Sequence, residues 1–115
     1  MLRRLHDTGG SIRLLHDEPG RAWTVDTLAR EVALSRSLFA QRFTVLVGES
    51  PMQYLTRWRL ALAARALRAG DEAITRLAER SGYATDAAFS RAFKREFGLP
   101  PSAWRAAPGI VNRPA

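Results

Sequence analysis

The chain has 115 residues, enough for one domain or for two small lobes that share a core, and too few for a large separate enzyme domain. Hydrophobic residues make up 46% and charged residues 25%, a balance that argues against wholesale disorder. The 18 Lys and Arg residues outnumber the 11 Asp and Glu residues, and the net charge of +7 attracts polyanions. All but one of these cations are arginine, whose planar guanidinium matches phosphates and guanine edges, so nucleic acid is the expected partner.

Residue types that carry chemistry are missing or isolated. The chain has no cysteine, which excludes a disulfide, a thiolate zinc site and a thiol nucleophile. Its two histidines, His6 and His16, have no metal-ligand partners at helical spacing, and no catalytic set of carboxylates or of Ser, His and Asp converges on a site. No apolar run approaches about 18 residues. We therefore expect no enzyme activity, metal, cofactor or membrane partner, and a soluble, cytoplasmic protein.

Helical periodicity runs along the chain and predicts an all-α fold of about seven helices. Residues 1–10, which end in two glycines, are expected to be a loose lead-in, and residues 107–115 a flexible tail. Capping residues such as Thr24 and Ser35 mark helix starts, and glycines such as Gly48 mark helix ends. The expected helices span residues 11–17, 25–32, 36–47, 51–69, 74–80 and 86–97, with a last short turn from Pro101.

One sequence frame occurs twice, fifty residues apart. Each copy places a helix, a turn and a second helix before a glycine and a proline, which is a helix-turn-helix arrangement. We expect lobe one over about residues 11–50, a linker helix over 51–69 and lobe two over about 70–106. The matched positions are Phe39, Phe43, Gly48 and Pro51 in the first copy and Phe89, Phe93, Gly98 and Pro101 in the second.

The second helix of each copy has an apolar face and an opposite face of small or hydrogen-bonding residues. These opposite faces are either solvated faces of an ordinary helical bundle or surfaces that enter a DNA major groove, where small residues allow close approach. The expected buried stripes are Phe39, Phe43 and Leu46 in the first copy and Phe89, Phe93 and Phe97 in the second. The opposite faces carry Ser37, Ala40, Gln41 and Thr44, and Ala87, Ser90, Arg91 and Lys94.

Two side chains on these faces are suited to reading bases. Gln41 can pair with adenine and Arg91 with guanine, through two hydrogen bonds each. Neighbouring cations and hydroxyls are placed to meet phosphates, which position a protein on DNA without reading its sequence. The expected phosphate contacts are Arg36, Arg42, Thr44, Lys94 and Arg95.

The linker helix would be about 28 Å long at ~1.5 Å per residue, on the scale of the ~34 to 36 Å between successive major-groove faces. One chain could therefore read two adjacent segments of DNA. The apolar side chains expected to face the lobes are Tyr54, Leu55, Trp58, Leu60, Leu62 and Leu67. The arginines Arg57, Arg59, Arg65 and Arg68 are expected to be either solvated or near the DNA backbone, with Arg59 also able to face the lobes.

Two segments of the sequence resemble a known protein family. "LAREVALSRSLFAQRFTVLVGESPMQYLTRWRLALAARAL" and "ITRLAERSGYATDAAFSRAFKREFGLPPSAWR" resemble the DNA-binding domain of AraC/XylS-type transcription regulators, over about residues 23–105. The resemblance implies a seven-helix, two-lobed domain, here residues 11–106, whose third and sixth helices enter neighbouring major-groove segments of promoter DNA. The base-reading positions that it implies are Ser37, Ala40 and Gln41 in the first copy and Asp86, Ala87, Ser90 and Arg91 in the second.

Three features depart from the family pattern. Ala33 lies in a turn where many members, and the second copy at Gly82, have glycine, so the first turn is expected to be strained or differently shaped. Ala40 offers only a methyl group where members often have a longer polar side chain, so the first helix is expected to read fewer bases. No sensor domain precedes Met1, so we expect the effector-sensing part to be absent from this chain, which is either a stand-alone regulator or a domain of a longer protein.

Together these patterns favour a sequence-specific, double-stranded DNA-binding transcription regulator that reads two adjacent major-groove segments of promoter DNA and works with RNA polymerase. The alternative is a helical adaptor module that docks on RNA polymerase or another regulator without specific DNA reading. An enzyme is the weakest interpretation, because no reactive set of residues is present.

Overall fold

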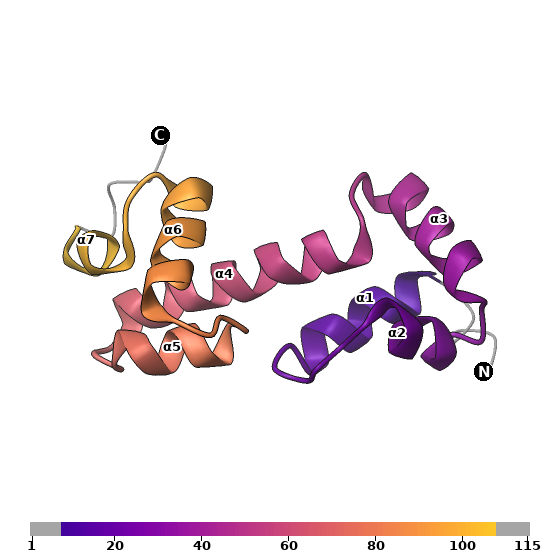
Figure 1. Ribbon diagram of the computed structural model, residues 1–115, viewed down its shortest axis with the longest axis horizontal. Helices are drawn as coiled ribbons and strands as arrows, with labels where there is room; N and C mark the ends of the chain where they lie inside the picture. The colour runs from indigo at the N-terminus through magenta and orange to yellow at the C-terminus, as the bar shows by residue number, and fades with distance from the viewer. Residues whose placement is uncertain (1–7, 108–115) are drawn as a thin grey trace. The chain divides into compact units, whose positions relative to one another are not determined.

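The computed structural model describes residues 8–107, which form seven helices and no strand (Figure 1). The expected all-α fold is therefore confirmed. None of the described helices combines the length and the apolar character needed to cross a membrane. The helices are α1 (Thr8–Asp17), α2 (Val25–Glu31), α3 (Arg36–Val47), α4 (Pro51–Ala69), α5 (Ile74–Arg80), α6 (Asp86–Phe97) and α7 (Pro101–Ala106).

The chain divides into two compact units, and the boundary between Trp58 and Arg59 lies inside α4. The helix expected over residues 51–69 is present as α4, but it is shared by the two units and does not lie between them as a separate linker. Its first part carries Leu55, which is buried in the core of the first unit, and its second part carries Leu60 and Leu67, which are buried in the core of the second. Each half of α4 thus serves as the last or first core helix of a lobe.

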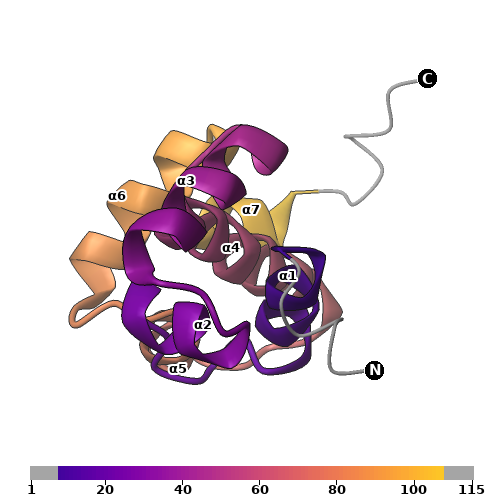
Figure 2. The same ribbon diagram turned by 90° about the vertical axis from the view of Figure 1, so that its right-hand side faces the viewer.

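In the first unit, α1, α2 and α3 pack with the beginning of α4 around one apolar core (Figure 2). Trp23 lies in this core and donates its indole N–H to the carbonyl of Glu18 at 2.8 Å. His16 of α1 stacks on Trp58 of α4, with ring centroids 4.0 Å apart. The buried apolar residues are Leu15, Trp23, Leu28, Ala29, Val32, Phe39, Phe43 and Leu55.

In the second unit, α5, α6 and α7 pack with the remainder of α4. The short helix α7 is held to α4 by hydrogen bonds to backbone carbonyls: Trp104 Nε1 donates to Ala64 O at 3.0 Å and Arg105 Nε donates to Leu67 O at 3.1 Å. The buried residues of this core are Leu60, Ala63, Ala64, Leu67, Leu77, Ala78, Phe89, Ala92 and Phe93.

Helix α1 begins at Thr8, three residues before the expected start. The expectation of a loose lead-in is wrong for residues 8–10, whereas residues 1–7 lie outside the described residues, as do residues 108–115 of the expected tail. The buried pair Ser11 and Leu15 fixes the helix from its second turn onward. Glycines in the first turn cost only about 1 kcal/mol each, and the N–H groups there need no intrahelical partner.

The buried stripe of α3 ends at Val47 rather than at Leu46. Leu46 is 63% exposed, while Val47 packs against the core of the first unit. Phe39, Phe43 and Val47 are spaced four apart, as are the phenylalanines of α6, so the second copy shows the correct register. Helical phase alone allows either residue, since Leu46 is seven residues from Phe39 and Val47 is four from Phe43, so the packing of the core decides between them.

The two helix-turn-helix turns share one hydrogen-bond pattern. Leu34 N bonds to Ala29 O at 2.9 Å, and Tyr83 N bonds to Ala78 O at 3.0 Å. Both turns need a residue with positive φ, which is Gly82 at 89° in the second copy and Ala33 at 58° in the first. The first turn is therefore strained, as expected, and it keeps the same hydrogen bonds.

Exchanging the residues at these turns should have opposite effects on stability. Ala33→Gly removes a left-handed conformation that costs a side chain about 1 to 2 kcal/mol, against about 0.4 to 1 kcal/mol of added unfolded-state entropy, so a gain of up to about 1 kcal/mol is expected. Gly82→Ala should lose up to about 1.5 kcal/mol from the same two terms, and its Cβ would also lie 3.0 Å from Arg59 Nη1, which must shift. Urea unfolding followed by circular dichroism measures both, and a loss of stability in Ala33→Gly would contradict the strain.

Candidate nucleic-acid interface

Helix α3 is fixed at both ends and along its inner face. Ser35 caps its start by accepting a hydrogen bond from Leu38 N at 3.2 Å, and Gly48 ends it with a φ of 94°. Phe39 and Phe43 are fully buried beneath it. These contacts set the rotation of the helix about its axis, so its outer residues are presented in a defined order.

The three expected base-reading positions of α3 and the expected phosphate contact Thr44 share its outer side. Ser37, Gln41 and Thr44 are exposed and Ala40 is half-buried. Their spacing of three and four residues puts them on one face of the helix. Two hydroxyls, one amide and one methyl group are therefore brought together, without a charge among them.

Helix α6 repeats this construction. Thr85 accepts a hydrogen bond from Ala88 N at 3.0 Å, Gly98 ends the helix with a φ of 86°, and Phe89 and Phe93 are fully buried. The outer face differs in charge from that of α3. Ala87, Arg91 and Lys94 are exposed and Ser90 is half-buried, so this face carries two cations.

Asp86, the first residue of α6, does not stand alone. Its Oδ2 accepts a hydrogen bond of 2.8 Å from the hydroxyl of Thr75 in α5. The equivalent positions of the first unit are linked as well: Arg36, the first residue of α3, lies 3.8 Å from Asp26 of α2. The pair that joins the two helices of each helix-turn-helix thus has a carboxylate on α2 in one copy and on α6 in the other.

Thr75 was missed by sequence reasoning, although the repeat contained a signal for it. An offset of 49 places Thr75 where the first copy has Asp26, and an offset of 50 places Asp86 where it has Arg36. Only the distances show that each pair is in contact.

The expected phosphate contacts fall into two groups. Arg36, Thr44, Lys94 and Arg95 are exposed at the ends or edges of the outer faces. Arg42 is exposed too, but it is two residues from both Ala40 and Thr44, which at about 100° per residue puts it on the other side of α3. It lines a groove with Leu38, Val45 and Leu46 instead.

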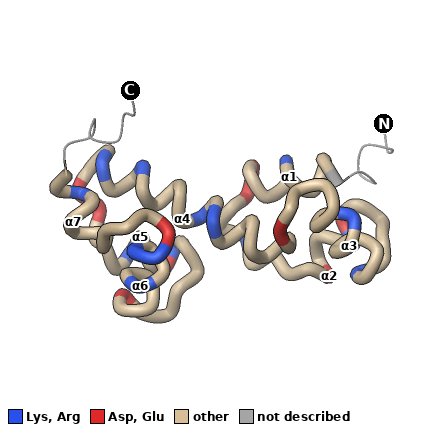
Figure 3. Tube along the Cα trace, turned by 90° about the horizontal axis from the view of Figure 1, so that it is seen from above, with Lys and Arg blue, Asp and Glu red and all other residues tan. Residues whose placement is uncertain are grey.

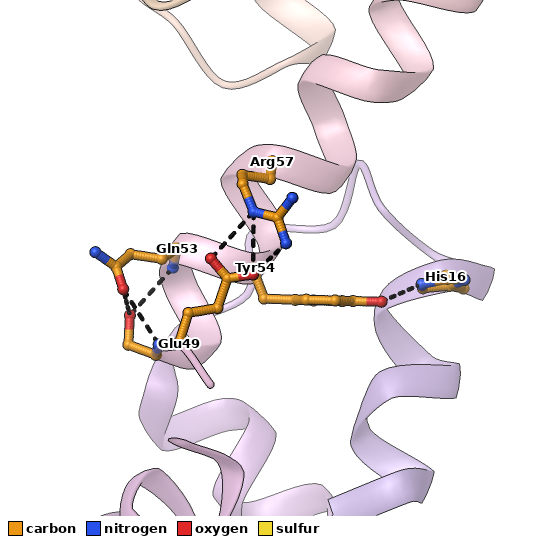
Figure 4. A network of polar contacts seen from close by, with 6 residues as sticks. His16, Glu49, Gln53, Tyr54 and Arg57 are labelled. Atoms are coloured by element: carbon orange, nitrogen blue, oxygen red, sulfur yellow. Dashed lines mark hydrogen bonds and ion pairs between the residues drawn. The ribbon is translucent and has the colours of Figure 1, made fainter. Parts of the chain in front are cut away.

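Two arginines of α4 have partners within the protein, although the side chain of Arg57 stays exposed. Arg57 donates from Nε and Nη2 to the carboxylate of Glu49, and Figure 4 shows this pair beside the bond between Tyr54 and His16. This hydrogen bonding lowers the pKa of Glu49 below its usual value. Arg68 lies over the Trp104 ring at 3.8 Å from its centroid.

The other two arginines of α4 differ from one another. Arg59 is half-buried next to the turn at Gly82, and this burial lowers its pKa. Arg65 is exposed and keeps the expected solvated position. Figure 3 marks the charged residues along the chain. Arg57 contacts Glu49 and Arg68 contacts Trp104, so a count of the cations on α4 overstates the number available to bind a polyanion.

Comparison with known proteins gives consistent matches to this arrangement. The sequence model of a family described as "Helix-turn-helix domain" matches residues 28–107. A putative AraC-like transcription regulator of Streptomyces lividans is 47% identical over 98 residues, which cover 85% of this chain and 32% of the relative. The transcriptional activator RclR of Escherichia coli is 39% identical over 97 residues, covering 84% of this chain and 34% of that protein. The chain therefore spans about a third of the length of these curated relatives.

Solved structures of similar chains agree. The DNA-binding domain of the global transcriptional factor AdpA, determined in complex with a target DNA, is 31% identical, with a TM-score of 0.81 over 93% of this chain and 96% of that one. The C-terminal domain of AraT, a response regulator from Geobacillus stearothermophilus, is 25% identical, with a TM-score of 0.81 over 94% of this chain and 90% of that domain.

Proposed function

Because the chain belongs to the AraC-type family of helix-turn-helix proteins, we propose that it is a sequence-specific, double-stranded DNA-binding transcription regulator. The observation that carries this proposal is the duplicated outer face: two capped helices, each anchored by two buried phenylalanines, present small and hydrogen-bonding residues at the same spacing. Each lobe places one of these helices in its own major-groove segment, so that one chain reads two adjacent segments. The proposed activity is binding, with no catalytic step.

Helix α3 reads its segment through few direct contacts. Gln41 pairs with an adenine through two hydrogen bonds, Ser37 contributes a hydroxyl, and the methyl group of Ala40 meets a thymine methyl. The absence of charge among these three residues makes this lobe the weaker reader.

Helix α6 supplies the stronger contacts. Arg91 pairs with a guanine, Ser90 bonds to a base edge, and the small side chain of Ala87 lets the backbone approach. Asp86 accepts a hydrogen bond from the amino group of a cytosine. The only other base donor that a carboxylate can meet in the major groove is adenine N6. Thr75 restricts the rotation of this carboxylate and leaves Oδ1 to face the DNA.

Phosphates are met by residues at the edges of both faces, namely Arg36, Thr44, Lys94 and Arg95. Two of these phosphate-binding cations, Lys94 and Arg95, lie on α6, and one, Arg36, lies on α3. We assign Arg42 to a different contact, because it lies on the other side of α3.

At a bacterial promoter, within the nucleoid, such a regulator would act together with RNA polymerase. The alternative of an adaptor that docks without reading DNA is not favoured, since the similar AdpA domain was solved on a target DNA. Selection of bound sites from random double-stranded DNA tests the proposal: it requires a recurrent sequence with two separated contact blocks. Equal recovery of all sequences at physiological salt would refute it.

Arg91→Ala and Arg36→Ala should weaken DNA binding in different ways. Loss of a bidentate guanine contact is expected to cost about 1 to 3 kcal/mol, concentrated at one base pair of the selected site. Loss of a phosphate contact should weaken all sequences alike and reduce the slope of log affinity against log salt by about one. Binding titrations on the selected site and its single-base variants at several salt concentrations separate these effects. The reverse pattern would show that the two roles are exchanged.

Thr75→Val, which keeps the shape of the side chain and removes its hydroxyl, should weaken discrimination at the base pair read by Asp86. The freed carboxylate can rotate, so we expect the preference for the selected base to fall about threefold to tenfold, less than the loss of a full base contact. Thr75→Ser retains the hydroxyl and serves as the matched control. Competition binding with DNA altered at that base pair measures the preference. An equal loss of affinity for every sequence in Thr75→Val would assign Thr75 a purely structural role.

A further inference from the structure

Helix α3 carries an apolar surface that neither the core nor the proposed reading face uses. We call it the α3 groove, and its volume is about 490 Å³. Val45 is 81% exposed, Leu46 63% and Leu38 36%. Among the described residues, the only other large exposed apolar side chain is Leu99. Exposed apolar side chains that gather in one place usually mark a contact site. The groove is lined by Leu38, Gln41, Arg42, Val45 and Leu46.

The fold does not require this apolar surface. Helix α6 has the same length, caps and buried phenylalanine pair, yet it has Arg95 and Glu96 where α3 has Val45 and Leu46. The second lobe therefore folds around the same frame with charged residues at these positions.

The groove adjoins the proposed reading face along one edge and shares Gln41 with it. Arg42 and Leu46 lie on the side of α3 opposite Ala40 and Thr44, at about 100° per residue. Gln41 borders both surfaces. A partner seated in the groove would leave Ser37, Ala40 and Thr44 free and would contact Gln41, which the proposed function assigns to an adenine.

The shape and charge of the groove indicate what fits it. Leu38, Arg42 and Val45 follow the helical spacing of four and then three residues, so the groove runs along α3 and suits a second helix packed along it. Helix α3 has no acidic residue, and Arg42 forms no ion pair with any residue in the described part of the chain. A second copy of this chain fits poorly, because a two-fold contact would bring one Arg42 close to the other.

We propose that the α3 groove docks an amphipathic helix of a partner protein, whose apolar side chains cover Leu38, Val45 and Leu46 and whose acidic side chain pairs with Arg42. The contact gives the first lobe a second role: its helix reads few bases on one face and holds a protein on another. It goes beyond the proposed function and does not depend on which DNA sequence is read.

Two synthetic helical peptides test the proposal on the full chain. Both carry leucines at positions i, i+3, i+4 and i+7, and they differ only in having glutamates or lysines beside the leucines. Fluorescence anisotropy measures affinity, and backbone amide shifts in NMR spectra locate the contact. We expect the Glu peptide to bind more tightly than the Lys peptide and to shift amides of α3 that line the groove.

Variants of exposed residues separate the apolar and the charged parts of the contact. Val45→Ser combined with Leu46→Ser should weaken both peptides at least tenfold. Arg42→Glu should weaken the Glu peptide at least tenfold and strengthen the Lys peptide. Leu99→Ser and Arg65→Glu are matched controls, since they remove an exposed apolar side chain and reverse an exposed arginine elsewhere; both should bind the Glu peptide like the wild type.

Four outcomes would overturn the proposal. The first is no binding of the Glu peptide up to about 1 mM, a limit that corresponds to about −4 kcal/mol. The second is equal preference for the two peptides in the wild type and in Arg42→Glu. The third is self-association of the wild type, measured by sedimentation and lost in the double serine variant, which would assign the groove to a second copy.

The fourth outcome concerns DNA. If the double serine variant loses affinity for the selected site and for random DNA alike, the groove belongs to the DNA interface. A chain that binds the Glu peptide in the groove and shows no preferred DNA site would refute the proposed function and leave this inference standing.

Discussion

The burial of four phenylalanines decides how this protein presents its surface. Phe39 and Phe43 in the first unit, and Phe89 and Phe93 in the second, are fully excluded from solvent. Burying one such ring is worth about 1.5 to 3 kcal/mol, so rotating either helix to bring another face inward would be costly. The identity of the outer residues can therefore change without changing where they point. This explains how two copies of one frame come to carry an uncharged face and a cationic face.

Helix α4 contributes to the core of each lobe, in which the buried phenylalanine rings pack. The first part of α4 packs in one core and the second part in the other, and this also explains which partners its arginines contact. Arg57 and Arg68 find partners in Glu49 and Trp104, because each lobe folds back on the half of α4 that it uses. Two of the arginines of α4 therefore help to hold the turn after α3 and the helix α7 in place.

Much of the fold could be predicted from the sequence, because local signals determine it. Ser35, Thr24 and Gly48 act within a few residues of their position, and the repeat tests each assignment twice. Leu46 was assigned wrongly because an apolar residue at i+3 or i+4 satisfies the same pattern, and only packing distinguishes them. The stacking of Arg68 on Trp104 joins residues 36 positions apart, and no periodicity reports such a contact. Spacing identified the outer-face positions and the family resemblance added Asp86, whereas Thr75 required a distance.

The position of the unit boundary inside α4 has a consequence for how such proteins can be recombined. A cut between Trp58 and Arg59 would break backbone hydrogen bonds in the middle of a helix and leave four N–H and four C=O groups without partners at the new ends. A lobe taken alone would also lose part of its support from the continuous helix. Exchange of lobes between relatives must therefore join them within α4 and preserve its helical phase. Inserting or deleting one residue there would rotate the second part of α4, with the lobe packed on it, by about 100° about the helix axis.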